Sequence, residues 1–368
     1  MKDDPDKDPP TAIWLVGKQE QNMKEKESMI KNVLVTGGSG RLGNFVCPYL
    51  KSQGYNVVST DQVPAPKESE NAKARIPFIK ADLLSVGDLL KAILFAKADA
   101  VVHLGAIPSS TELQSPFDDR ELGPTPGGRV TSWRMEEDTT MKVNTMGMYY
   151  VLDACRRLGV KTCITTTSYY AYGQGGQIGG KPIDIPRLPI DEDMPCQPGD
   201  TYSLSKYLAE EIMKAFTRSY DMRCVALRLN GVFYYNAPFA KFVYRFPVDC
   251  PEKAPEGKGY IDGGLSEHVD ARDVARIIDM ALQKIDELPN AYEAFNVWSC
   301  THYNCETNIA YRAKYPQYGD LVDNIKGYNG LFSIEKAQKL LGYEPEWTWR
   351  KGNVEPTNDG KPLPPFPF

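Results

Sequence analysis

The sequence predicts an α/β protein with a doubly wound parallel sheet and a smaller C-terminal subdomain. Between Lys31 and Leu229, short apolar runs alternate with amphipathic stretches of helical period. Such alternation is typical of a parallel sheet covered by helices on both faces. The alternation decays after Gly231, which indicates a separate, less regular subdomain. The chain has 368 residues, 42% of them apolar, which is enough to bury a sizeable core.

The elements follow one another in a regular order. The expected strands are 33–36, 56–60, 76–80, 100–104, 162–166 and 224–229, and the expected helices are 42–53, 86–95, 141–158 and 202–220. Pro48 lies inside the first helix and should kink it, because proline lacks the backbone N–H that a helix uses. Right-handed crossovers between these strands give a doubly wound sheet.

Composition excludes several classes of partner. The 43 basic and 48 acidic residues give a net charge of −5, so neither nucleic acid nor an anionic membrane is expected to bind. No run reaches the roughly 18 apolar residues of a membrane span.

The eight cysteines are scattered, which favours a reduced, cytoplasmic setting. Cys300 and Cys305 flank His302 without a standard zinc spacing, so we expect ordinary thiols and no metal.

A glycine cluster follows the first strand and opens the first helix. Gly37, Gly40 and Gly43 are spaced G-x-x-G-x-x-G, with Arg41 and Leu42 between the last two. Glycines let backbone N–H groups approach a pyrophosphate at a helix N-terminus. A plain flexible turn is the alternative, but the position between strand and helix favours a dinucleotide site in a Rossmann-type fold.

Two carboxylates follow the next strands. Asp61 ends the second strand, where it could accept both ribose hydroxyls of an adenosine or be a solvated turn residue. Gln62 rather than an arginine follows it, which favours NAD over NADP. Asp82 ends the third strand, where it could meet the adenine amine or cap a helix.

A tyrosine and a lysine share one helix face near the fifth strand. Tyr202 and Lys206 are four residues apart, and Ser168 ends the fifth strand. A nearby ammonium favours the phenolate of a tyrosine, which can then take the proton of a substrate hydroxyl. Ser168 could hold the substrate oxygen. Asn144 could orient a water or the lysine, or simply be a polar residue between helices.

With these residues, the chain resembles an extended short-chain dehydrogenase/reductase of the NAD-dependent epimerase/dehydratase family, over about residues 31–350. The resemblance is carried by the glycine cluster, Asp61, the segments 80–83 and 101–106, Asn144, Ser168, Tyr202, Lys206, 268–275, 333–337 and 341–345. It implies Tyr202 as acid/base, Lys206 on the nicotinamide ribose, Ser168 on the substrate hydroxyl and Asn144 as the fourth member. It also implies cofactor contacts at Leu83 and Leu104, and a homodimer built on the two long helices.

Composition and the order of elements predict four parts of the chain. Residues 1–30 are expected to form a disordered arm, and 31–230 the NAD-binding domain with a lid-like insertion at 109–140. Residues 231–350 are expected to form the substrate-binding subdomain, and 351–368 a proline-rich tail.

Departures from the family pattern narrow the expected reaction. Tyr169 and Tyr170 stand where the family's dehydratases place an Asp-Glu pair. Tyr234 and Tyr235 replace the Gly-Pro of many nucleotide-sugar members, and no arginine precedes His268 closely. The leading hypothesis is therefore an NAD-dependent oxidoreductase acting on a secondary alcohol of a sugar, sugar acid or similar small molecule. An NAD-retaining sugar or nucleotide-sugar epimerase is the alternative, and a non-catalytic NAD-sensing protein is a third reading.

Overall fold

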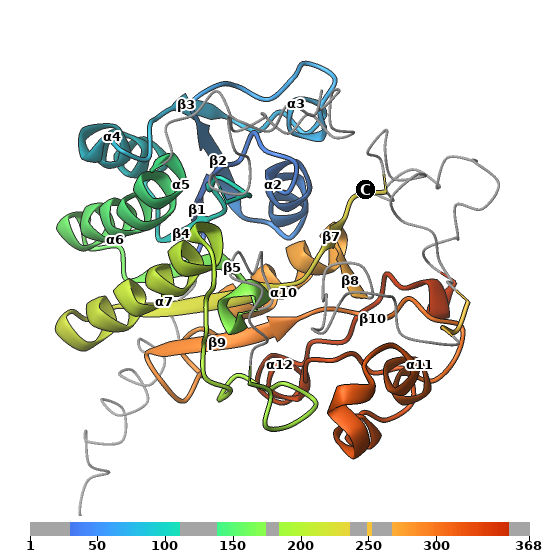
Figure 1. The fold of residues 1–368 in the computed structure, drawn as a ribbon. Coiled ribbons are helices and arrows are strands. Elements are labelled where there is room, and N and C mark those ends of the chain that lie inside the picture. Colours follow the sequence, from blue (N-terminus) through green and yellow to red (C-terminus); the bar gives the residue numbers. More distant parts are fainter. Residues whose placement is uncertain (1–29, 111–137, 174–183, 236–248, 252–266, 353–368) are drawn as a thin grey trace, which may run out of the picture.

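The computed structural model describes residues 30–110, 138–173, 184–235, 249–251 and 267–352 (Figure 1). Nearly all of the expected N-terminal arm and tail, and most of the expected lid-like insertion, lie outside these ranges. No helix of the described part is long and apolar enough to cross a membrane.

A seven-stranded sheet forms the centre of the molecule, and each of its strand pairs is parallel, as the sequence predicts. Its order is β3-β2-β1-β4-β5-β6-β9. The strands are β1 (Asn32–Thr36), β2 (Asn56–Asp61), β3 (Phe78–Lys80), β4 (Ala100–His103), β5 (Thr162–Ser168), β6 (Arg223–Leu229) and β9 (Tyr292–Val297). The order reverses direction between β1 and β4, which is where ligands bind in open sheets of this kind.

The last strand of this sheet comes from beyond the expected domain boundary at residue 230. β9 pairs with β6 along its whole length, from Cys224 opposite Tyr292 to Leu229 opposite Val297. Three further strands, β7 (Val232–Phe233), β8 (Glu267–Asp270) and β10 (Cys300–Thr301), form a small sheet of their own. The C-terminal residues therefore build part of the central sheet as well as a separate layer.

Helices cover both faces of the central sheet (Figure 1). The helices are α2 (Gly43–Ser52), α3 (Glu70–Lys73), α4 (Val86–Ala96), α5 (Thr139–Met141), α6 (Gly147–Leu158), α7 (Thr201–Ser219), α10 (Ala271–Lys284), α11 (Thr307–Lys314) and α12 (Glu335–Leu341). α2 is one helix through Pro48. The helix expected at 141–158 is divided, because a π-helical turn at Lys142–Met146 separates α5 from α6.

Alternation along β1 divides the core into two layers. Val33 and Val35 belong to one apolar cluster, together with Val46 of α2 and residues of α10. Leu34 between them belongs to the other cluster, with residues of α4, α6 and α7. Successive side chains of a strand point to opposite faces, so one buried strand supplies both layers. This arrangement fixes the loops that follow the strands along one edge of the sheet.

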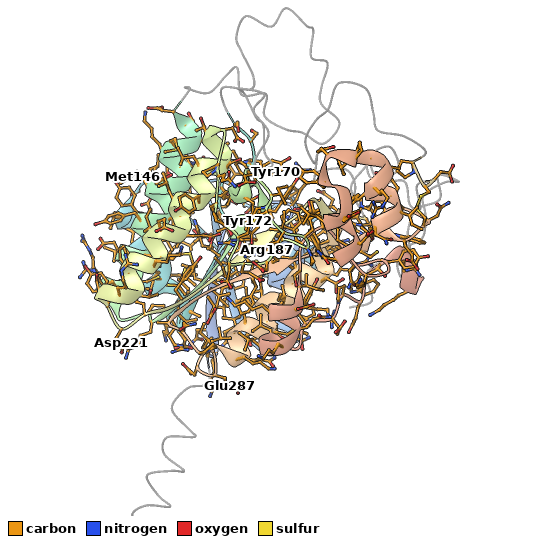
Figure 2. All side chains as sticks on the ribbon, turned by 60° about the horizontal axis from the view of Figure 1, so that its bottom comes forward. Met146, Tyr170, Tyr172, Arg187, Asp221 and Glu287 are labelled. Carbon is orange, nitrogen blue, oxygen red and sulfur yellow. A yellow bond between two sulfur atoms is a disulfide. The ribbon has the colours of Figure 1, made fainter. Side chains whose placement is uncertain are left out.

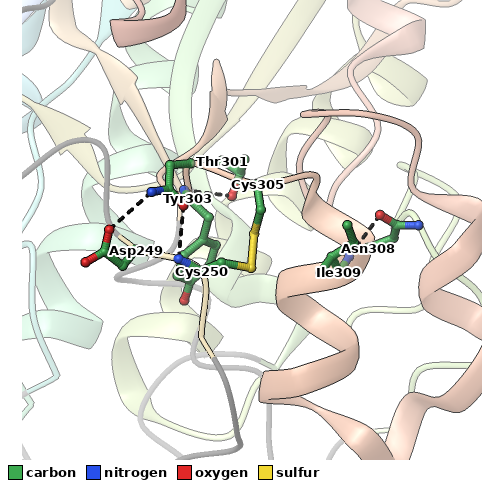
Figure 3. Close-up of a disulfide and its surroundings, with 8 residues drawn as sticks. Asp249, Cys250, Thr301, Tyr303, Cys305, Asn308 and Ile309 are labelled. Carbon is green, nitrogen blue, oxygen red and sulfur yellow. Dashed lines mark hydrogen bonds between the residues drawn. A yellow bond between two sulfur atoms is a disulfide. The ribbon is translucent and has the colours of Figure 1, made fainter.

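The expectation of ordinary thiols is wrong for Cys305. Cys250 and Cys305 form a disulfide with their Cα atoms 5.7 Å apart (Figure 3). Beside it, the amide of Asn304 accepts a bond from the Cys250 N–H (3.0 Å) and donates one to Asp249 (3.1 Å). The two cysteines are 55 residues apart, and sequence alone does not give such a pairing.

Candidate active site

The glycine loop after β1 is shaped by close backbone approaches. Gly37 has φ +67°, and a Cβ there would lie 2.5 Å from the backbone nitrogen of Gly105. A Cβ on Gly43 would lie 2.3 Å from the carbonyl oxygen of Gly38. The fold itself therefore requires these two glycines. Gly40 is exposed at the N-terminal end of α2, where a ligand can approach its backbone.

Asp61 lies beside this loop at the end of β2. One carboxylate oxygen accepts the Ser39 N–H (3.2 Å) and the other accepts the Gln62 N–H (2.8 Å). Burial raises the pKa of Asp61, and the two backbone donors work in the opposite direction. Each carboxylate oxygen can accept a second hydrogen bond, so the pair of ribose hydroxyls expected here can be accommodated.

Buried polar atoms around the loop lack partners. Within the described ranges, six buried side-chain atoms have no hydrogen-bond partner, and four of them belong to Ser39, Ser59, Thr60 and Asn71. Asn71 also donates to the carbonyl of Gly38 (2.7 Å), which places it against the loop. Unsatisfied buried polar groups are rare and often mark the place of a ligand or water. The residues present therefore fit a nucleotide cofactor at the loop.

The other expected cofactor residues lie at the same edge. Asp82 does not cap α4, because Ser85 accepts the N–H of Asp88, and Asp82 instead accepts the N–H of Leu84 (2.9 Å). Leu83 packs so close to Gly105 that a Cβ on that glycine would lie 2.9 Å from it. Three further expected residues lie nearby. The Leu104 N–H donates to the carbonyl of Thr36 (3.0 Å) and Leu42 is half-buried. Arg41 is exposed, with its guanidinium 5.7 Å from the centre of the Tyr234 ring.

The structure brings Tyr202 and Lys206 together at the carboxyl end of β5. Lys206 Nζ donates to the carbonyl of Thr166 (3.1 Å) and lies 5.8 Å from the centre of the Tyr202 ring. Lys206 is buried, and this burial lowers its pKa from 10.5 to about 8. A buried ammonium this close to a phenol favours the phenolate electrostatically.

Ser168 and Tyr202 are linked through Tyr170. Ser168 is the last residue of β5, and its hydroxyl accepts the N–H of Tyr170 (3.2 Å). The Tyr170 ring meets the Tyr202 ring edge-on, with centres 6.0 Å apart. Figure 2 shows Tyr170 and Tyr172 between the helices of the N-terminal part and the C-terminal elements. Ser168 therefore lies on the same edge as the tyrosine and lysine.

Asn144 joins the loop after β4 to α7. Its side-chain oxygen accepts the Ile107 N–H (2.7 Å), and its amide donates to the Ile107 carbonyl (3.0 Å) and to the Ser205 hydroxyl (2.9 Å). Asn144 therefore contacts Ser205, the residue before Lys206, and makes no hydrogen bond to Lys206 itself. Asn144 lies in the π-helical turn, which is a common feature of functional sites.

Sequence reasoning missed a second set of contacts at the start of α7. The carboxylate of Asp200 caps this helix by accepting the Ser203 N–H (2.9 Å), and it also bonds the hydroxyl of Ser110. That hydroxyl accepts the N–H of Tyr202 (3.3 Å). The contacts fix Tyr202 relative to the loop after β4. Asp200 stands two residues before the helix predicted at 202–220, and an aspartate at the start of a helix is a recognised N-cap signal that could have revealed this role.

His103 lies beneath the site as a neutral imidazole. Its Nδ1 lies 2.6 Å from the hydroxyl of Thr36, and burial, with Lys206 nearby, lowers its pKa to about 3. His103 therefore adds no positive charge next to Lys206. Among the residues that the structure describes, no group of three His, Cys, Asp or Glu side chains could hold a metal ion.

Comparisons with known proteins identify the family of the chain. The sequence model of the NAD dependent epimerase/dehydratase family matches residues 33–117 and 127–297. A UDP-glucose 4-epimerase of Mycolicibacterium smegmatis is 26% identical over 196 residues, which are 52% of this chain and 53% of that protein. The chain thus spans about half the length of that relative. A UDP-glucose 4-epimerase of Lacticaseibacillus casei is 25% identical over 367 residues, covering 89% of this chain and 99% of that protein.

Solved structures share the fold. A UDP-glucose 4-epimerase of Thermotoga maritima with UDP-glucose has a TM-score of 0.59 and 21% identity, covering 89% of this chain and 97% of that one. A UDP-glucose 4-epimerase of Brucella ovis in complex with NAD has a TM-score of 0.59 and 19% identity, covering 86% and 94%. The fold, the glycine loop and the family match lead to one assignment: the chain belongs to the NAD-dependent epimerase/dehydratase family.

Proposed function

We propose that this protein moves a hydride between NAD and a secondary alcohol or ketone carbon of a sugar, sugar acid or related polyhydroxylated small molecule. The observation that carries the proposal is the pairing of Tyr202 with the buried Lys206 beside Ser168. The glycine loop and Asp61 lie at the same edge of the sheet and fit NAD. Asp61 favours NAD because its charge repels the 2′-phosphate of NADP.

Each residue has a defined part in this chemistry. NAD, when bound, supplies a hydride acceptor and a positive charge near the phenol. Tyr202 takes the proton of the substrate hydroxyl as the carbon is oxidised, and returns it in the reverse direction. Lys206, which is protonated below its pKa of about 8, stabilises the phenolate. Ser168 holds the substrate oxygen by a hydrogen bond.

An epimerase that retains NAD is the second candidate. The relatives and solved structures are named UDP-glucose 4-epimerases, which favours this candidate and a nucleotide-sugar substrate. Tyr202, Lys206, Ser168 and Asn144 would serve both reactions. An epimerase differs by keeping the reduced cofactor and returning the hydride to the opposite face of the sugar. Tyr169 and Tyr170 after β5 argue against dehydration, which the family's dehydratases carry out with an Asp-Glu pair.

A single assay separates the candidates. Purified protein is incubated with NAD and a panel of sugars, sugar acids and nucleotide sugars, and NADH absorbance is followed. More than one equivalent of NADH per enzyme indicates a dehydrogenase, whereas a changed sugar without net NADH indicates an epimerase.

Tyr202→Phe should bind NAD normally and lose most of the turnover, roughly 100-fold or more for a lost acid/base. Tyr207→Phe on the same helix is the control, and full turnover in Tyr202→Phe would contradict the assignment.

We further propose a homodimer built on α6 and α7. Met146, Tyr149 and Leu204 leave 40%, 42% and 38% of their surface exposed on these helices and the turn before them. Figure 2 shows Met146 on the outer side of the helical layer. Exposed apolar side chains on neighbouring helices are typical of an interface. Tyr149→Lys should give a monomer by sedimentation equilibrium, whereas Phe95→Lys on α4 should not.

We further propose that the protein is cytoplasmic. Six cysteines are free thiols, which supports a cytoplasmic location. The bond between Cys250 and Cys305 argues instead for an oxidising compartment, where disulfides persist. Cell fractionation combined with thiol labelling of the native protein decides between the two.

A further inference from the structure

Asn230 is a buried amide with an unused donor group. Only 4% of its surface is exposed. Its side-chain oxygen accepts the N–H of Gly231 (2.6 Å), which fixes the orientation of the amide. Its Nδ2 has no hydrogen-bond partner in the part of the chain that the structure describes. A buried donor without an acceptor is destabilising, so this arrangement needs a reason.

Asn230 lies where the substrate is expected. It directly follows β6, and Leu229 before it is paired with Ser168 at the end of β5. Arg228, two residues earlier, points to the face that α7 covers, because it bonds Glu210 of that helix. Side chains two residues apart in an extended chain share a face. Asn230 therefore belongs to the same edge of the sheet as Ser168, on the side of Tyr202 and Lys206.

The fold satisfies a comparable asparagine completely. Asn296 on β9 is equally buried, and its Nδ2 donates to the carbonyls of Ile190 and Ser333 (both 3.2 Å). Its oxygen accepts the hydroxyl of Tyr172 (2.8 Å). Asn296 is thus a structural residue, and it provides a matched control. Asn230 differs from Asn296, because its Oδ1 accepts the Gly231 N–H while its Nδ2 is left without an acceptor in the described residues.

We propose that Asn230 Nδ2 donates a hydrogen bond to the substrate, at a hydroxyl or carbonyl oxygen close to the carbon that is oxidised. This inference rests on the proposed function and adds a residue that selects the substrate. A site built to bond a substrate oxygen discriminates strongly against analogues that lack it. The carboxamide oxygen of NAD is the other acceptor that could reach this region, and the test below separates it from the substrate.

The test compares Asn230→Ala and Asn230→Asp with Asn296→Ala. The probe is whichever of UDP-glucose, D-glucose and D-glucuronate the wild-type protein turns over fastest. Both Asn230 variants should lose about tenfold or more in kcat/KM, which is the usual effect of removing one buried hydrogen bond to a ligand. Their Kd for NAD, measured by calorimetry, should stay unchanged. Asn230→Ala removes the unsatisfied Nδ2 and also the oxygen that accepts the Gly231 N–H, so the melting temperature should change little. Asn296→Ala should lower the melting temperature and keep its KM.

Three outcomes would overturn the inference. An unchanged kcat/KM in both Asn230 variants would show that the amide does not contact the substrate. A rise in the Kd for NAD as large as the loss in kcat/KM would assign the amide to the cofactor. If the wild-type protein turns over none of the three compounds, the proposed function fails first and this inference fails with it.

Discussion

Lys206 is held in a site that opposes its charge. It is buried, and its ammonium donates to the carbonyl of Thr166 without a carboxylate partner close by in the described residues. Burial of a cation favours the neutral form, which is why its pKa falls to about 8. At neutral pH the buried charge of Lys206 lowers the stability of the folded protein, but it places a cation beside Tyr202. Such opposition between stability and charge is typical of functional sites.

This opposition predicts a pH dependence of stability. The folded state loses the Lys206 proton near pH 8 and the unfolded state near pH 10.5, so between these values the unfolded state binds more protons. The free energy of unfolding therefore rises with pH in this window. Relative to Lys206→Met, the wild type should gain about 1 kcal/mol from about pH 8 to about pH 9 in urea unfolding. A pH-independent difference between the two proteins would contradict a lowered pKa.

Helix α7 is tied to the sheet by a buried ion pair. Glu210, one turn after Lys206, bonds Arg228 of β6 (2.7 Å), the hydroxyl of Thr167 of β5 (2.8 Å) and that of Tyr292 of β9 (2.8 Å). Burial works to raise the pKa of Glu210, but Arg228 and the hydrogen bonds outweigh it and hold the pKa below its usual range. Three strands thus fix the helix that carries Tyr202 and Lys206.

Breaking this pair should be costly. Glu210→Ala leaves the Arg228 guanidinium buried without its carboxylate, so it should lower the free energy of unfolding by about 3–5 kcal/mol. The double variant Glu210→Met with Arg228→Met removes both charges and should recover most of that loss. The control is Lys161→Ala, whose pair with Asp221 is exposed and screened by solvent, so its loss should change the stability far less. Equal effects at the two pairs would show that burial does not set the cost.

At the scale of elements, local patterns were readable and distant contacts were not. The first six strands of the central sheet and the glycine loop follow from apolar runs and from turns that only glycine tolerates, so the sequence predicted them within a few residues. β9 and the small sheet of β7, β8 and β10 were not predicted. The π-helical turn at Asn144 depends on bonds to Ile107, 37 residues away, and carries no local signal. The unpaired amide of Asn230 is a property of its surroundings and was invisible for the same reason.

At the scale of the whole molecule, a covalent link ties the C-terminal layer together. The bond from Cys250 to Cys305 closes a loop of 55 residues, and such a constraint on the unfolded chain is typically worth about 2–4 kcal/mol. Cys250→Ala should lower the free energy of unfolding by about that amount. Cys196→Ala, which removes a free thiol, is the control. A reducing agent should bring the wild type to the stability of Cys250→Ala, and an unchanged wild type would contradict the bond.

The position of β9 has a consequence for how the chain matures. β6 has one neighbour, β5, until residues 292–297 are added on its other side. β6 ends at Leu229 and β9 begins at Tyr292. During synthesis the growing chain therefore carries an open strand edge while more than sixty further residues are added. Unpaired edges of apolar strands join other chains readily. A nascent or truncated chain that stops near residue 230 should depend on chaperones, although it contains the whole glycine loop and both Tyr202 and Lys206.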